Sequence, residues 1–149
     1  MEFTDPVRLV LENKGQNVHS IGPEDTVYHA LEQMSQFGVG ALLVKVGDEI
    51  VGILSERDYA RKIALQGRNS QVTQVREIMT TEVLTASPED SVEKCIQLIT
   101  ENRIRHLPIL EGETLLGVIT SSDLIRWING RQQETIAHLK HYIESGYAR

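Results

Sequence analysis

A hydroxyl residue followed three positions later by an aspartate occurs twice in this chain, each time after a glycine and a short apolar run. The two copies are GILSERD at residues 52–58 and GVITSSD at residues 117–123. A serine or threonine that begins a helix, with a carboxylate three residues on, makes a capping box. Beside the positive end of a helix, the same hydroxyl and carboxylate also suit the phosphate and the ribose of a nucleotide. The spacing alone leaves both interpretations open.

The duplication extends far beyond these two phrases at a fixed offset of 65 positions (117 − 52). The segment VHSIGPEDTV at residues 18–27 aligns without a gap with VLTASPEDSV at residues 83–92. Self-similarity at a fixed period indicates a repeat that does not bury its apolar face alone. We therefore expect two repeats that share one core, neither of which folds well without the other.

Each repeat predicts the order β-α-β-β-α, and thus an α+β fold. A short strand leads through a proline-marked turn into a helix whose apolar residues recur at spacings of three and four. Two strands then flank a turn at Gly47 or Gly112, and a second helix begins at Ser55 or Thr120. The expected divisions are a first repeat with its own N-terminal helix at residues 1–66, a polar linker at 67–74, a second repeat with its leading helix at 75–130, and a C-terminal helix at 131–149.

The composition narrows the class of protein. A net charge of −6 and a pI near 5.4 argue against nucleic acid or an anionic membrane as the main partner. Apolar runs fall far short of the 18 or so residues that span a bilayer, and the N-terminus has no hydrophobic signal core. The single cysteine, Cys95, lies on the apolar stripe of a predicted helix and is expected in the core. We expect a soluble cytoplasmic protein.

In the order and spacing of these phrases the chain resembles the CBS-domain pair, or Bateman module. The resemblance covers residues 5–130, includes the glycine-to-aspartate phrase in both halves, and is greatest to the short stand-alone bacterial CBS-pair proteins, whose segments are similar to SERDYARK, REIMT and RHLPIL. It implies tandem repeats about a pseudo-twofold axis, with two related clefts that bind an adenosyl ligand. Members of the family bind AMP, ADP or ATP, and some bind NAD(H) or S-adenosylmethionine.

The resemblance also assigns residues to the parts of such a ligand. It implies that Asp58 and Asp123 hold the ribose hydroxyls. The positions that face the phosphates are Ser55, Arg57, Arg103, Arg105, His106, Thr120 and Ser122. On the adenine side it implies the first strand of each repeat and the lysine before it, namely Lys14, Asn17, His19, Ser20, Val83, Leu84 and Thr85.

The basic residues of ENRIRHLP, residues 101–108, make the two repeats unequal. Arginine donates two hydrogen bonds from a planar, permanently charged fork and so suits a phosphate, although a solvated turn would also carry such residues. The matching positions of the first repeat are Gly38, Gly40 and Ala41, which carry no charge. We therefore expect two sites that differ in phosphate affinity.

The sequence leaves three classes of function to compare. A regulatory nucleotide sensor without catalytic activity agrees best with two intact motifs, and an interaction scaffold with vestigial sites is the alternative. An enzyme is disfavoured because the sequence shows no nucleophile–base pair, no phosphate loop and no metal constellation. The resemblance implies a homodimer, and because the chain shows no catalytic domain, the regulated target is expected to be a separate protein. No catalytic cofactor, metal, nucleic acid or membrane partner is expected.

Overall fold

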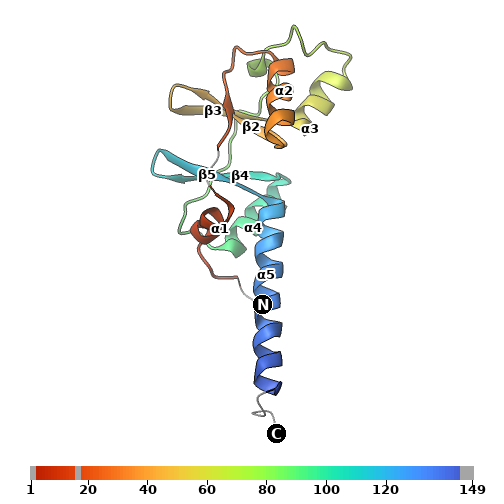
Figure 1. Cartoon of the computed structure of the whole chain (residues 1–149). Coiled ribbons are helices and arrows are strands. Elements are labelled where there is room, and N and C mark those ends of the chain that lie inside the picture. Colours follow the sequence, from red (N-terminus) through yellow and green to blue (C-terminus); the bar gives the residue numbers. More distant parts are fainter. Residues whose placement is uncertain (1–2, 16–17, 145–149) are drawn as a thin grey trace. The chain divides into compact units, whose positions relative to one another are not determined.

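The structure, a computed structural model, describes residues 3–15 and 18–144 of the chain (Figure 1). It contains both helices and strands, which confirms the α+β class. The chain divides into two compact units. Unit 1 combines Met1–Asn17 with Thr85–Arg149, and unit 2 is Val18–Leu84.

A β-hairpin lies at the centre of each unit. In unit 2, β2 (Ala41–Val46) pairs antiparallel with β3 (Glu49–Ser55). In unit 1, β4 (His106–Glu111) pairs in the same way with β5 (Thr114–Thr120). In both hairpins the register shifts at the same place, after Val44 in one and after its repeat partner in the other. The repeat in the sequence is therefore a repeat in the structure.

The turn of each hairpin depends on a glycine. Gly47 and Gly112 have φ angles of 61° and 62°, in the left-handed region that glycine adopts without a steric penalty from a Cβ atom. Their presence at equivalent positions explains why both hairpins close with the same geometry.

The first helix of each repeat follows the proline-marked turn, as the sequence predicted. α2 (Val27–Phe37) is capped by the Thr26 hydroxyl, which accepts a hydrogen bond from the backbone N–H of His29. α4 (Val92–Asn102) is capped by Ser91 in the same way. Each hydroxyl satisfies one of the N–H groups that a helix leaves unpaired at its start.

The leading strands are shorter than expected. β1 (Ser20–Ile21) pairs parallel to β2. In the second repeat the short strand expected before the proline-marked turn is reduced to one parallel bridge between Ala86 and Ile109.

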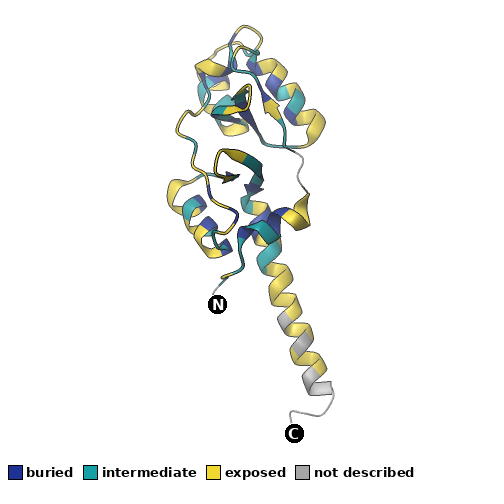
Figure 2. Cartoon of the chain, turned by 90° about the vertical axis from the view of Figure 1, so that its left-hand side faces the viewer, coloured by how far each residue is buried: buried dark blue, intermediate teal, exposed yellow. Residues whose placement is uncertain are grey.

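The second helices of the two repeats differ. In unit 2, α3 (Glu56–Tyr59) continues as a π-helical turn, η1 (Ala60–Ala64). In unit 1, α5 (Ser121–Glu144) is one uninterrupted helix that passes Gly130 and includes the described part of the predicted C-terminal helix. Its C-terminal half is exposed wherever burial is described (Figure 2).

The segment that leads into each repeat packs with the other repeat. α1 (Val7–Lys14) belongs to unit 1, where its Val7 N–H donates to the carbonyl of Asp90. The 3-10 turn η2 (Val75–Glu77) belongs to unit 2, where Val75 donates to the carbonyl of Asp25. The compact units therefore cut across the order of the chain, whereas the sequence predicted each leading segment with the repeat that follows it.

Each unit encloses a buried apolar cluster of its own. That of unit 1 contains Val7, Val10, Leu11, Ala86, Val92, Cys95, Ile99, Leu107, Ile109, Ile119 and Leu124. That of unit 2 contains Ile21, Val27, Ala30, Met34, Leu42, Val44, Leu54, Ile63, Val75 and Ile78. A short helix is marginal alone in water, so burial of these faces is what holds α1 and η2 in place. Within the described residues, no helix combines the length and apolar character needed to cross a bilayer.

Candidate ligand-binding site

The hydroxyl–aspartate phrase forms a complete capping box in the first repeat. Asp58 Oδ2 accepts hydrogen bonds from the backbone N–H of Ser55 at 3.0 Å and from its hydroxyl at 3.1 Å. In return, the Ser55 hydroxyl accepts from the Asp58 N–H at 3.2 Å. The interpretation as a helix start is therefore correct, and the Asp58 carboxylate lies in the first turn of α3.

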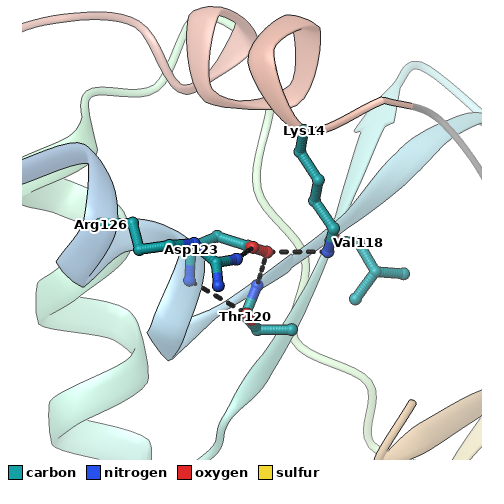
Figure 3. A network of polar contacts seen from close by, with 5 residues as sticks. All are labelled: Lys14, Val118, Thr120, Asp123 and Arg126. Carbon is teal, nitrogen blue, oxygen red and sulfur yellow. Dashed lines mark hydrogen bonds and ion pairs between the residues drawn. The ribbon is translucent and has the colours of Figure 1, made fainter. Parts of the chain in front are cut away.

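The second repeat makes the same reciprocal pair and adds two cations (Figure 3). Asp123 Oδ2 accepts from the Thr120 N–H at 2.8 Å and from Lys14 Nζ at 2.7 Å. Its other oxygen, Oδ1, accepts from Arg126 at 2.6 Å. Lys14 also donates to the carbonyl oxygen of Val118 at 2.7 Å. Only 3 % of the Asp123 side chain is exposed, so these groups surround the carboxylate almost completely.

The charge of Asp123 is stabilised by this network. Burial by itself raises the pKa of the Asp123 carboxyl, but the hydrogen bonds from Lys14 and from the Thr120 N–H outweigh burial and hold the pKa below its ordinary value. Asp123 is therefore ionised at neutral pH.

Asp58 has looser surroundings. Its Oδ1 lies 3.2 Å from Lys62 Nζ and accepts from the Thr80 hydroxyl at 3.3 Å. Lys62 also donates to the carbonyl oxygen of Ile78 at 2.8 Å, so both aspartates have a lysine that is anchored to backbone. The Asp58 side chain is 13 % exposed, and its contacts with these two residues are longer than those that Lys14 and Arg126 make with Asp123.

The basic segment of the second repeat lies beside the start of α5. The N–H of Ser121 donates to the carbonyl oxygen of Arg105 at 3.0 Å, and His106 pairs directly with Thr120 in the hairpin. Arg105 is exposed and His106 is half-buried. Backbone N–H groups at a helix start and neighbouring basic side chains together favour an anion.

Arg103 occupies an unusual backbone conformation. It ends α4 with φ 53° and ψ 41°, in the left-handed region, and is the one non-glycine residue with positive φ among the described residues. The equivalent position of the first repeat is Gly38, with φ 66°. The second repeat thus has an arginine at a left-handed backbone position that glycine would adopt with less steric strain.

The remaining predicted residues are placed as follows. Arg57 and Ser122 are exposed in the first turns of α3 and α5. His19 stacks its ring on Phe37, with centroids 3.9 Å apart. Ser20 lies exposed in β1.

On the adenine side the placement is less regular. Val83 is half-buried, whereas Leu84 and Thr85 are exposed. Lys14, predicted on this side, contacts Asp123. Asn17 lies outside the described residues.

Besides the contact of Lys14 with Asp123, three contacts of the aspartates were not predicted. Arg126 stands three residues after Asp123, a spacing that brings helical side chains together, so this partner was readable from the sequence. Lys62 stands four residues after Asp58 and was readable on the same ground. Thr80 reaches Asp58 through the packing of the other repeat's leading segment, for which no local signal exists. The part of the chain that the structure describes holds no cluster of three or more histidine, cysteine, aspartate or glutamate residues suited to a metal.

Comparison with known proteins agrees with this geometry. The CBS domain-containing protein CBSX3, mitochondrial, of Arabidopsis thaliana is 40% identical over 167 residues, which cover 98% of this chain and 81% of the relative. A solved structure of a protein with CBS domains from Burkholderia ambifaria is 43% identical with a TM-score of 0.81, over 83% of this chain and 93% of that one. The hexameric CBS-CP12 protein from bloom-forming cyanobacteria is 30% identical with a TM-score of 0.74, over 83% of this chain and 68% of that one.

The family model for the CBS domain matches residues 14–65 and again residues 75–130. These two matches contain the two capping boxes and both hairpins. The chain therefore belongs to the CBS-domain family and carries two CBS domains in tandem.

Proposed function

We propose that this chain is a regulatory module that binds an adenosyl nucleotide (AMP, ADP, ATP or NAD(H)) at the two hydroxyl–aspartate segments. The observation that carries the proposal is the position of Asp58 and Asp123. Each is an ionisable carboxylate in the first turn of a helix that directly follows a hairpin strand, at the same place in two CBS domains.

The division of labour follows from charge. A carboxylate repels phosphate but accepts hydrogen bonds from the hydroxyls of a ribose. Phosphate groups suit the N–H groups at the helix start, the hydroxyls of Ser55 and Thr120, and the basic residues Arg103, Arg105 and His106. Because the first repeat has Gly38, Gly40 and Ala41 at the positions of these three basic residues, the second repeat is the better match for a ligand with more phosphates.

Regulation rather than catalysis agrees with the residues present. The described residues combine carboxylates, hydroxyls and basic groups that recognise a nucleotide, and the free energy for control would come from the ligand's different affinity for two states. We assign no catalytic step to them. The target of regulation is a separate protein, and assembly as a homodimer is part of the proposal.

A second candidate, an interaction scaffold, is favoured by one observation. α5 exposes Ile125, Ile136 and Leu139 by more than half of their surface. In this alternative the aspartates serve only as helix caps. Calorimetry separates the two candidates, because a scaffold would bind no adenosyl ligand.

The test is isothermal titration of the purified chain with AMP, ATP, NADH and S-adenosylmethionine. Wild type is expected to bind at least one of them at micromolar strength, and Asp58→Asn and Asp123→Asn are expected each to remove one binding event. Asp25→Ala and Asp90→Ala are matched controls, since each removes a carboxylate that caps a backbone N–H and faces an exposed basic side chain four residues on, outside the hydroxyl–aspartate segments. Absence of binding by folded wild type at the first domain, where the ion pair of Asp58 with Lys62 is longer than those of Asp123, would refute the proposal.

A further inference from the structure

Lys14 comes from a distant part of the chain to contact the carboxylate that the proposed function assigns to ribose. It ends α1, 109 residues before Asp123, and its Nζ lies 2.7 Å from both Asp123 Oδ2 and the carbonyl oxygen of Val118 (Figure 3). The side chain is one-third exposed, so its aliphatic stem is largely covered while its charge points at a buried partner.

The contact leaves Asp123 little capacity for a ligand. A carboxylate accepts about four hydrogen bonds, and Asp123 already accepts from Lys14, from the Thr120 N–H and from Arg126. Two neighbouring ribose hydroxyls would need two of those places on a side chain that is 3 % exposed. One resident donor must therefore leave before a ribose binds.

Lys14 is the donor that a ribose would replace. The Thr120 N–H is part of the helix cap and is fixed by the backbone. Arg126 contacts the other oxygen, Oδ1, from a position three residues further along the same helix. Lys14 shares Oδ2 with the cap and sits at the last residue of an eight-residue helix, so it leaves without breaking any backbone hydrogen bond of α5.

We propose that Lys14 is an internal competitor of the ribose at Asp123, so that ligand binding at the second domain detaches the C-terminal end of α1. This inference rests on the proposed function and adds a regulatory element to the same site. It makes Asp58 the site that fills first, because its lysine contact is longer, at 3.2 Å, and comes from the same local helix rather than from α1.

Detachment of Lys14 has a route to the rest of unit 1. α1 is also held near its N-terminal end, where Asp5 accepts a hydrogen bond from the indole of Trp127 at 3.2 Å and pairs with Arg131 at 3.2 Å. Trp127 is the single tryptophan of the chain. Its fluorescence therefore reports on the contact between α5 and the segment that leads into α1.

The experiment compares Lys14→Met with wild type in an Asp58→Asn background, so that only the second site remains. Removing a charged hydrogen bond that must otherwise be broken should tighten the binding of AMP or ATP by about tenfold or more. Lys94→Met, which removes an exposed lysine paired with Asp90 in the same unit, is the matched control and should leave binding unchanged. Unchanged or weaker binding by folded Lys14→Met would overturn the proposal.

A measurement on chains that retain Lys14 covers the case in which Lys14→Met fails to fold. Saturation of the Asp58→Asn chain with AMP should lower the hydrogen-exchange protection of the last turn of α1 and shift the Trp127 emission. Unchanged or increased protection of this turn would contradict the proposal that the ribose displaces Lys14. The proposed function is tested separately by measuring whether AMP binds at the Asp58 site of the wild-type chain. If no AMP binds there, the proposed function itself fails. If that site binds AMP and the Lys14→Met site does not tighten, only the present inference fails.

Discussion

Ile53 and Thr80 exchange two backbone hydrogen bonds, each 2.9 Å long, and these attach the segment after η2 to the outer side of β3. The adjacent Gly52 makes this approach possible. A Cβ atom there would lie 2.9 Å from the carbonyl oxygen of Thr80 and 2.8 Å from the sulfur of Met79. The glycine that precedes the hydroxyl–aspartate phrase is therefore required for close packing of the other repeat's leading segment.

Gly52→Ala should destabilise the chain by about 1–3 kcal/mol, because backbone must move to admit the methyl group. Gly117→Ala is the matched comparison, since its Cβ would meet only the flexible end of Leu11, at 2.7 Å. We expect a smaller loss there. Urea unfolding curves of both variants measure the difference, and equal losses would contradict the argument.

Arg103→Gly should raise the free energy of unfolding by about 1 kcal/mol, because it relieves a left-handed conformation at the end of α4. The same variant should bind ATP more weakly if the Arg103 side chain contacts phosphate. Gly38→Ala serves as the opposite control and should destabilise the chain. Thermal unfolding together with calorimetry measures both quantities, and a destabilised Arg103→Gly would show that its side-chain contacts outweigh the backbone strain.

The contribution of Asp123 to the free energy of unfolding should depend on pH and be lost in acid. Its folded-state pKa lies below the ordinary value of 3.8, so the unfolded state binds the proton more readily. The contribution is complete above the ordinary pKa and is lost as pH falls through the folded-state value. The stability difference between wild type and Asp123→Asn should therefore be constant near neutrality and shrink below about pH 4. A difference that does not change with pH in chemical denaturation would contradict this.

Cys95 should react slowly with thiol reagents in the folded chain. Burial raises the pKa of its thiol to about 11, and the side chain is completely covered in the core of unit 1. Because the thiolate is the reactive form, labelling requires opening of the unit. The rate with a maleimide should rise in Gly117→Ala in proportion to its loss of stability. Fast labelling of the native chain would show that this core opens locally.

Much of the fold could be predicted because its signals are local. The caps at Thr26 and Ser91, the turns at Gly47 and Gly112, and the starts of the second helices all follow from residue types at fixed spacings. The length of α5 could not be predicted in this way. The sequence predicts a division between the second repeat, which ends at residue 130, and the C-terminal helix, but nothing lies within 4 Å of the place of the missing Cβ of Gly130, and the helix continues through it.

The site was predictable only in part, for a related reason. The sequence identified Asp58 and Asp123 through their repeated phrase, and their role toward a ligand remains a prediction. It did not identify Lys14 as the partner of Asp123, because that contact depends on which unit α1 joins. Apolar periodicity shows that a helix has a face to bury and does not show which sheet will bury it.

The exchange of leading segments also sets an order of events during synthesis. A ribosome releases the chain from its N-terminus, so all of Val18–Leu84 emerges before β5 exists. Leu11 packs against Gly117, at a place where a Cβ atom would collide with it, so this contact forms only after Gly117 has been synthesised. While the chain grows, the apolar face of α1 has no partner to pack against, because the rest of unit 1 is not yet synthesised. A nascent chain stalled after Leu84 would expose this face to chaperones. Cutting the gene between the two repeats would leave each product with the leading helix that belongs to the other.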